Sequence, residues 1–191
     1  GAINTTIQYT YSSAKANGDY DLGAFGEEFV DAPAQEYIMP FDRTHDLTGT
    51  FYTKLPFDIN AGLTYFYQSG FPFTPSILNA SGDKPVPDFL NKYSERSQAF
   101  QRVDLSFSKF IALNNTKLTL GLNIYNLFDS QNVNKVHELT GEADNPGEYY
   151  LNEDIQNIPS EGGDYSSGYY DRPWYYSSPR EINFFVRFDF N

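Results

Sequence analysis

Six segments of the chain alternate apolar and polar residues one by one, and this pattern limits what the chain can fold into. They cover about residues 3–12, 44–55, 58–70, 101–111, 117–127 and 181–190. Successive side chains of a β-strand point to opposite faces, so each segment predicts a strand with one apolar and one polar face. The pattern is clearest in the last segment, where every second residue is apolar: Ile182, Phe184, Val186, Phe188 and Phe190. The sequence therefore predicts an all-β chain.

The connections between these segments alternate strictly between short and long. Only LPFD separates the second segment from the third, and only ALNNT separates the fourth from the fifth, whereas the connections over 13–43, 71–100 and 128–180 are long. An antiparallel sheet threaded up and down would place the short turns at one end and the long loops at the other. Such asymmetry is typical of transmembrane β-barrels, and long loops without regular structure are uncommon in compact domains.

Composition narrows the classes of partner. Aromatic residues make up 18% of the chain, which suits sheets better than helix bundles. The formal net charge of −12, concentrated in the first and third long connections, argues against nucleic acid as a partner. The chain has no cysteine, and so no disulfide or thiolate metal site. No apolar stretch is long enough to predict a transmembrane helix, but transmembrane strands need only about 9–11 residues.

Two architectures fit the alternation. A soluble β-sandwich that serves as a binding module explains the strands and turns, but it does not explain the loop asymmetry. A transmembrane antiparallel up-and-down β-barrel explains both, because a tilted strand of about 10 residues spans roughly 24 Å, the height of the apolar band of such barrels. The smallest closed barrels have about eight strands, so we expect these six to be the C-terminal strands of a larger barrel, or to close with other chains.

Five motifs, in order along the chain, resemble the last strands of TonB-dependent outer-membrane receptors. They are FDRTHDLTGTFYTKLPF at 41–57, YQSGFPFTP at 67–75, QRVDLSFSKFI at 101–111, NIYNLFDSQN at 123–132 and SPREINFFVRFDF at 178–190. One departure lies in the closing strand, where the chain has Phe185 and the insertion signal of the family often has a small residue. The resemblance implies a barrel of about 22 strands in the outer membrane of a Gram-negative bacterium.

The resemblance also implies a function and a set of partners. The function is active uptake of a scarce nutrient, bound at extracellular loops and passed through a plugged barrel with energy from TonB. The implied partners are outer-membrane lipid, the rest of the barrel and its plug (from upstream sequence or another chain), the TonB complex acting through the plug, and a possible surface lipoprotein. The plug is not present within residues 1–191, and no cofactor is expected. A passive pore or adhesion barrel with acidic extracellular loops remains the alternative.

The stretch DYSSGYYDRPWYYSSPR, at 164–180, is the most suggestive candidate for a ligand site. Aromatic faces with a few polar groups suit sugars, aromatic siderophores or peptides. The candidate ligand-binding residues are Tyr165, Tyr169, Tyr170, Arg172 and Trp174. The alternative is an aromatic girdle at the membrane surface together with a self-packed loop, above all for Tyr175 and Tyr176.

The sequence offers no catalytic or metal-binding motif. It has no Gly-x-Ser-x-Gly, no phosphate loop and no paired histidine ligands, so we expect that the protein is not an enzyme. The acidic pairs Glu27–Glu28 and Glu153–Asp154 lack the spacing of an EF-hand, and we interpret them as solvated loop residues. We interpret Asn126 and Asp129 of NLFD as structural, because their side-chain oxygens can accept hydrogen bonds from backbone N–H groups where a strand ends.

Overall fold

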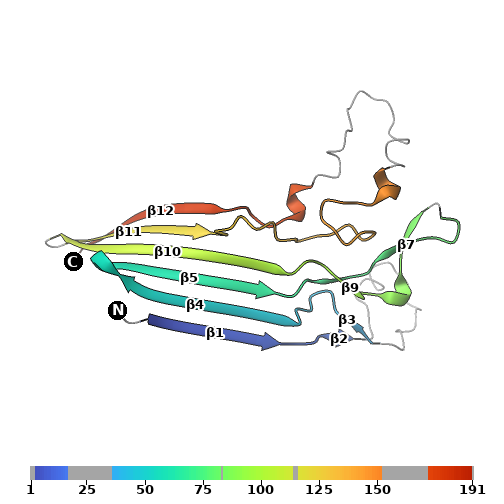
Figure 1. Cartoon of the computed structure of the whole chain (residues 1–191), viewed down its shortest axis with the longest axis horizontal. Helices are drawn as coiled ribbons and strands as arrows, with labels where there is room; N and C mark the ends of the chain where they lie inside the picture. Colours follow the sequence, from blue (N-terminus) through green and yellow to red (C-terminus); the bar gives the residue numbers. More distant parts are fainter. Residues whose placement is uncertain (1–2, 17–35, 83, 114–115, 152–171, 191) are drawn as a thin grey trace, which may run out of the picture.

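One antiparallel sheet of six strands dominates the computed structural model, which describes residues 3–16, 36–82, 84–113, 116–151 and 172–190. The strands lie side by side in the order β1-β4-β5-β10-β11-β12 (Figure 1). Their bounds are β1 Ile3–Tyr11, β4 His45–Leu55, β5 Ile59–Gln68, β10 Phe100–Leu113, β11 Thr116–Tyr125 and β12 Glu181–Phe190. The prediction of an all-β chain is confirmed. The sheet is open, because its edge strands β1 and β12 do not pair with each other.

The strand ends differ by a few residues from the sequence-based expectation. β10 runs on to Leu113, because the backbone pairing with β11 continues to the pair of Leu113 with Thr116. β11 stops at Tyr125 rather than at 127, because Asn126 has a φ of 53°, which leaves the extended conformation. β5 stops at Gln68, and the backbone of Gly70 then packs directly against the backbone of Ser97.

The short and the long connections lie at opposite ends of the sheet. The short turns, the start of β1 and the end of β12 lie at one end, and the described parts of the long connections lie at the other (Figure 1). The long connections contain three small two-stranded ladders, which pair β2 Lys15–Ala16 with β3 Tyr37–Ile38, β6 Pro72–Phe73 with β9 Glu95–Arg96, and β7 Ser76–Leu78 with β8 Pro85–Pro87.

The described residues also include the short 3₁₀ helices η1 Pro56–Asp58, η2 Phe89–Asn91 and η4 Pro173–Tyr175, and residues 148–151 are α-helical. η1 joins β4 to β5, and both Phe57 and Asp58 within it have positive φ angles. None of the helices in the described residues has the length and apolar character needed to cross a membrane.

The strand register gives the sheet one apolar and one polar face. One row of paired residues crosses all six strands on the apolar face: Ile3, Thr53, Ala61, Phe107, Leu122 and Phe184. The neighbouring row, displaced by one residue, lies on the polar face: Asn4, Tyr52, Gly62, Ser106, Asn123 and Asn183. Apolar side chains at the edges of the sheet are highly exposed, with 71% exposure for Ile7 and 69% for Phe184.

The hydrophobic core of the described residues lies outside the sheet. Its buried hydrophobic residues are Val136, Ala143 and Tyr175, all of which belong to the long connection between β11 and β12. A β-sandwich would bury the apolar faces of two sheets against each other. The part of the chain that the structure describes contains only one large sheet, and nothing in it covers the apolar face.

Aromatic rings cover two glycines on the polar face. The ring of Tyr52 lies over Gly62, and the ring of Phe185 lies over Gly121. In both cases a side chain on the glycine would overlap the ring, so the absence of a Cβ makes room for the aromatic residue.

Candidate functional site

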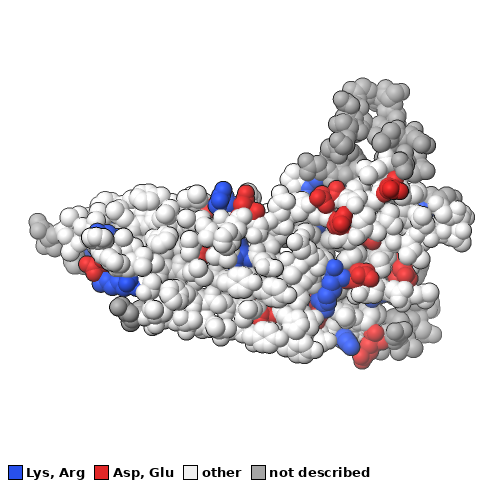
Figure 2. All heavy atoms as spheres, in the orientation of Figure 1, with Lys and Arg blue, Asp and Glu red and all other residues white. Residues whose placement is uncertain are grey.

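The loop end of the sheet carries most of the charged groups and is the natural place to look for a functional site. On the face seen in Figure 2, acidic and basic side chains gather over the described loops, whereas the strands carry few of them. A buried ion pair and the turn after β11 stabilise this end, which also contains a polar pocket.

The buried ion pair joins the first two long connections. Arg96 Nη2 lies 2.5 Å from Asp42 Oδ2, and only 1% of the Asp42 side chain is exposed. The same carboxylate accepts hydrogen bonds from Ala14 N–H at 2.7 Å and from Thr44 Oγ1 at 2.9 Å. Arg96 also donates to the carbonyl oxygen of Gly70, at 2.8 Å. Asp42 and Arg96 therefore tie the residues that follow β1 and β5 to the start of β4.

This environment keeps Asp42 ionised. Burial alone would raise the pKa of its carboxyl, but the hydrogen bonds from Ala14, Arg96 and Thr44 and the positive charge of Arg96 outweigh burial. The pKa of Asp42 therefore lies below its ordinary value.

The turn after β11 is built by the two residues that the sequence interpretation singled out. Asn126 Oδ1 accepts a hydrogen bond from Ser130 N–H at 2.9 Å, and Asp129 Oδ1 accepts one from Arg180 N–H at 2.7 Å. The side-chain amide of Asn126 also donates to the carbonyl oxygens of Ser130 and Ser178. The structural interpretation of Asn126 and Asp129 is confirmed. Together they hold the beginning and the end of the long connection between β11 and β12 at the top of the sheet.

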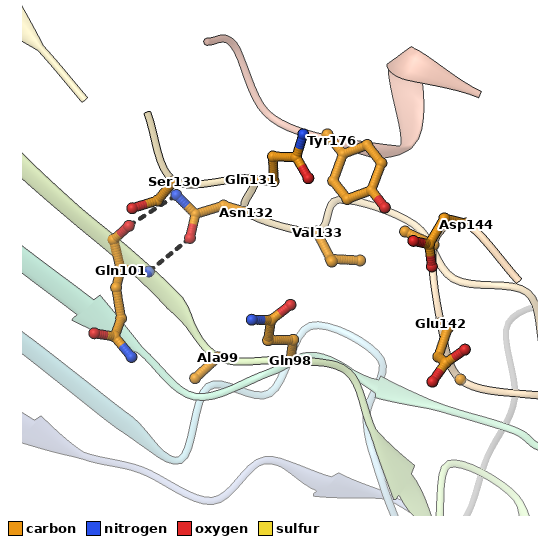
Figure 3. Close-up of a pocket in the computed structure, with 12 residues that line it drawn as sticks. Gln98, Ala99, Gln101, Ser130, Gln131, Asn132, Val133, Glu142, Asp144 and Tyr176 are labelled. Carbon is orange, nitrogen blue, oxygen red and sulfur yellow. Dashed lines mark hydrogen bonds between the residues drawn. The ribbon is translucent and has the colours of Figure 1, made fainter. Parts of the chain in front are cut away.

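Asn132 then anchors the returning chain to the top of β10. Its side chain accepts from Gln101 N–H at 2.7 Å and donates to the Gln101 carbonyl oxygen at 2.8 Å (Figure 3). A side-chain amide thus takes the place of a strand neighbour, and Asn132 is only 4% exposed. An isolated bridge between Val133 and Tyr176 joins the two ends of the connection.

A polar pocket of about 590 Å³ lies between the top of β10 and this connection. Its lining residues include Gln98, Gln101 and Gln131, the acidic residues Glu142 and Asp144, and Tyr176 (Figure 3). Among the described residues, no lysine, arginine or histidine lines it. The pocket can therefore offer many hydrogen-bond donors and acceptors together with a negative charge.

The sequence-predicted ligand residues are only partly placed. Tyr165, Tyr169 and Tyr170 lie outside the described residues. Arg172 and Trp174 are described, and neither lines the pocket. These two predicted residues therefore do not meet at the pocket, and no finding tests whether any of the five binds a ligand.

The described part of the aromatic stretch packs partly on itself and partly on residues 132–137. Arg172 donates to the hydroxyl of Tyr175 at 3.1 Å and lies over its ring. Tyr175 is buried, with its ring centroid 5.0 Å from that of His137. Burial, together with the positive charges of Arg172 and Lys135, lowers the pKa of His137. Trp174 is 69% exposed and meets Tyr175 edge to face.

Sequence reasoning missed the pocket residues Gln98, Gln131, Glu142 and Asp144. Gln131 lies in the NIYNLFDSQN motif, but Gln98, Glu142 and Asp144 lie in no motif, and contacts between distant segments bring the four residues together. Among the described lining residues, Tyr176 alone belongs to the aromatic stretch at 164–180. The sequence interpretation assigns it to an aromatic girdle or a self-packed loop.

The structure adds no candidate metal centre. Glu27, Glu28, Glu153 and Asp154 lie outside the described residues. Within the described ranges, no three histidine, aspartate or glutamate side chains lie close enough together to hold a metal ion. His45 Nδ1 lies 2.8 Å from the Tyr9 hydroxyl oxygen.

Comparison of the chain with protein-family models, with curated proteins and with solved structures found no match in any of the three.

Proposed function

We propose that this chain is the C-terminal part of the barrel of an active outer-membrane importer of the TonB-dependent kind. The importer binds a scarce nutrient at its extracellular loops and passes it through a plugged barrel, with energy from TonB. The plug and the remaining strands come from sequence outside residues 1–191 or from another chain. Lipid of the outer membrane covers the apolar face.

The single observation that carries this proposal is the pair of neighbouring rows across the sheet. The apolar row that ends on Phe184 is exposed at its edges, and the row that ends on Asn183 is polar across most of its length. A sheet with no protein over its apolar face and with polar residues on the other face fits a barrel wall between lipid and an aqueous lumen. The separation of short turns from long loops gives independent support (Figure 1). The five motifs supply the link to TonB-dependent receptors.

Spin labelling tests the membrane part of the proposal. The chain has no cysteine, so a nitroxide can be attached at Phe184→Cys or at the matched control Asn183→Cys, one residue away on the other face. The full gene product is placed in lipid vesicles, and the collision of each label with oxygen and with a water-soluble nickel chelate is measured. We expect oxygen to dominate at 184 and the nickel chelate to dominate at 183. Equal access of the nickel chelate to both labels would contradict a barrel wall and favour a soluble module.

Planar bilayer recordings test the importer part. A plugged importer is expected to show no steady conductance until the plug is removed. An open channel formed by the intact gene product would overturn active import and favour a passive pore.

A further inference from the structure

We propose that the pocket between the top of β10 and the connection that follows β11 binds a neutral, polyhydroxylated ligand such as a short oligosaccharide. The inference rests on the proposed function and names the class of nutrient that the importer takes up. Four observations carry it: the volume of the pocket, the rigidity of its walls, its charge, and the hydrogen-bonding groups that it presents.

The volume and the rigidity are those of a binding site. At about 590 Å³, the pocket falls within the ~300–1,000 Å³ range of small-ligand sites. Its walls are fixed by backbone contacts, because Asn132 bonds twice to Gln101 and its own carbonyl oxygen accepts from Ser177 N–H at 2.7 Å. On the far wall, Ala143 is 3% exposed, and the Glu142 carbonyl oxygen accepts from His137 N–H at 2.8 Å. A site with fixed walls loses little conformational freedom when a ligand binds.

The charge of the pocket selects against several ligand classes. Glu142 and Asp144 line it without any basic side chain, so phosphorylated ligands and anionic metal chelates meet like charge. The apolar side chains in its walls are small, namely Ala99, Val133 and Ala143, which gives a large apolar molecule little surface to bury.

The pocket is also a poor cation site. Glu142 Oε2 already accepts a hydrogen bond from the side-chain amide of Asn145, at 2.8 Å. The described residues hold no group of three acidic or histidine side chains that could bind a metal ion.

The remaining groups match hydroxyls. In the described ranges, the side-chain amides of Gln98 and Gln131 make no hydrogen bond to the protein, so each can both donate to and accept from a ligand. A sugar hydroxyl needs this combination, because it donates one hydrogen bond and accepts others. The carboxylates of Glu142 and Asp144 accept from further hydroxyls, and the half-buried ring of Tyr176 offers an apolar surface to the C–H groups of a sugar.

The test is a titration of the full gene product in detergent, followed by calorimetry. The probes are neutral pentasaccharides of glucose (α- and β-linked), xylose and mannose, with trilysine as the cationic and ferric citrate as the anionic competitor. We expect at least one pentasaccharide to bind and the competitors not to bind. The double change Gln98→Ala with Gln131→Ala is expected to weaken binding at least tenfold, which corresponds to about 1.4 kcal/mol. The matched control is Gln8→Ala, an exposed glutamine on β1 outside the pocket, and it is expected to bind like the unaltered protein.

Three outcomes would overturn the inference. The first is the absence of binding for every pentasaccharide up to about 1 mM. The second is a preference of the protein for trilysine or ferric citrate. The third is equal affinity of the double variant and the Gln8→Ala control. Should the double variant not fold, Asp144→Asn keeps the side-chain volume and provides the same comparison. The spin-label and conductance measurements do not depend on sugar binding, so their failure is distinguishable from failure of this inference.

Discussion

The aromatic ring of Phe185 lies over Gly121, its partner residue on the neighbouring strand, so that a Cβ on Gly121 would overlap the ring. β12 therefore contacts β11 through this packed ring as well as through backbone pairing. The insertion signal of TonB-dependent receptors often has a small residue where this chain has Phe185. Here the partner residue of Phe185 is a glycine, which accommodates the larger side chain.

We expect Gly121→Ala to lower the free energy of unfolding by about 1–3 kcal/mol, because the ring or the backbone has to move. The measurement is urea unfolding of the folded protein in detergent. Gly49→Ala on β4 is the matched control, because a Cβ there meets no atom within 4 Å. Combining Gly121→Ala with Phe185→Ala is expected to cost less than the sum of the two single changes. Strict additivity would show that the ring does not pack on the glycine.

A second prediction concerns the buried ion pair. Arg96→Met removes the ion-pair partner of the buried Asp42 carboxylate, while the positive charge of Arg43 still acts on it, and we expect a loss of about 3 kcal/mol in the stability of the loop end. Amide hydrogen exchange of Ala14, whose N–H donates to Asp42, should become faster. Lys54→Met breaks the exposed pair with Asp58 near the short turn and should change stability very little. Similar effects of the two changes would contradict the assignment of Asp42 and Arg96 as a structural anchor.

The pH dependence of the loop end follows from the same pair. The pKa of Asp42 lies below its unfolded value of about 3.9, so the unfolded chain binds a proton more readily than the folded chain. The stability that Asp42 provides is therefore fully present above the unfolded pKa and is lost as pH falls through the folded pKa. We expect exchange at Ala14 to accelerate, relative to its unfolded reference rate, below about pH 4. Asp42→Asn should remove this acid-dependent step, and a step that persists in this variant would assign it to another group.

The turn after β11 gives a graded series of variants. Asn126 has a positive φ of 53°, accepts from Ser130 N–H and donates to two carbonyl oxygens. Asn126→Gly keeps the backbone conformation and loses the hydrogen bonds, whereas Asn126→Ala loses both. We therefore expect stability to fall in the order Asn, Gly, Ala, with about 1 kcal/mol for each lost hydrogen bond. The measurement is thermal unfolding, and an alanine variant as stable as the glycine variant would show that the backbone conformation carries no cost.

The faces of the strands could be predicted from the sequence because alternation records them directly. Phe184 and Asn183 differ by one position, and the register places them on opposite faces. The strand ends could be predicted less well, because they depend on single backbone angles such as that of Asn126 and on contacts such as that of Gly70 with Ser97. Alternation contains no information about either.

The pocket could not be predicted for a different reason. Gln98 precedes β10, and Glu142 lies in the connection after β11, so their segments meet through long-range contacts such as the double hydrogen bond of Asn132 to Gln101 and the hydrogen bond from Ser76 N–H to the Glu138 carbonyl oxygen. The side chain of Asn132 takes the place of a paired strand beside Gln101, and no periodicity in the sequence predicts such a contact. The roles of Asn126 and Asp129 were predictable because a short polar side chain after a strand has few other uses.

The small core around Val136, Ala143 and Tyr175 lies outside the sheet, and this position affects how the protein unfolds. The loop end has a protein core of its own, whereas under the proposed function lipid or detergent covers the apolar face of the sheet. The two parts should therefore melt as separate cooperative units. The melting temperature of the sheet should follow the acyl chain length of the detergent or lipid, and that of the loop end should not.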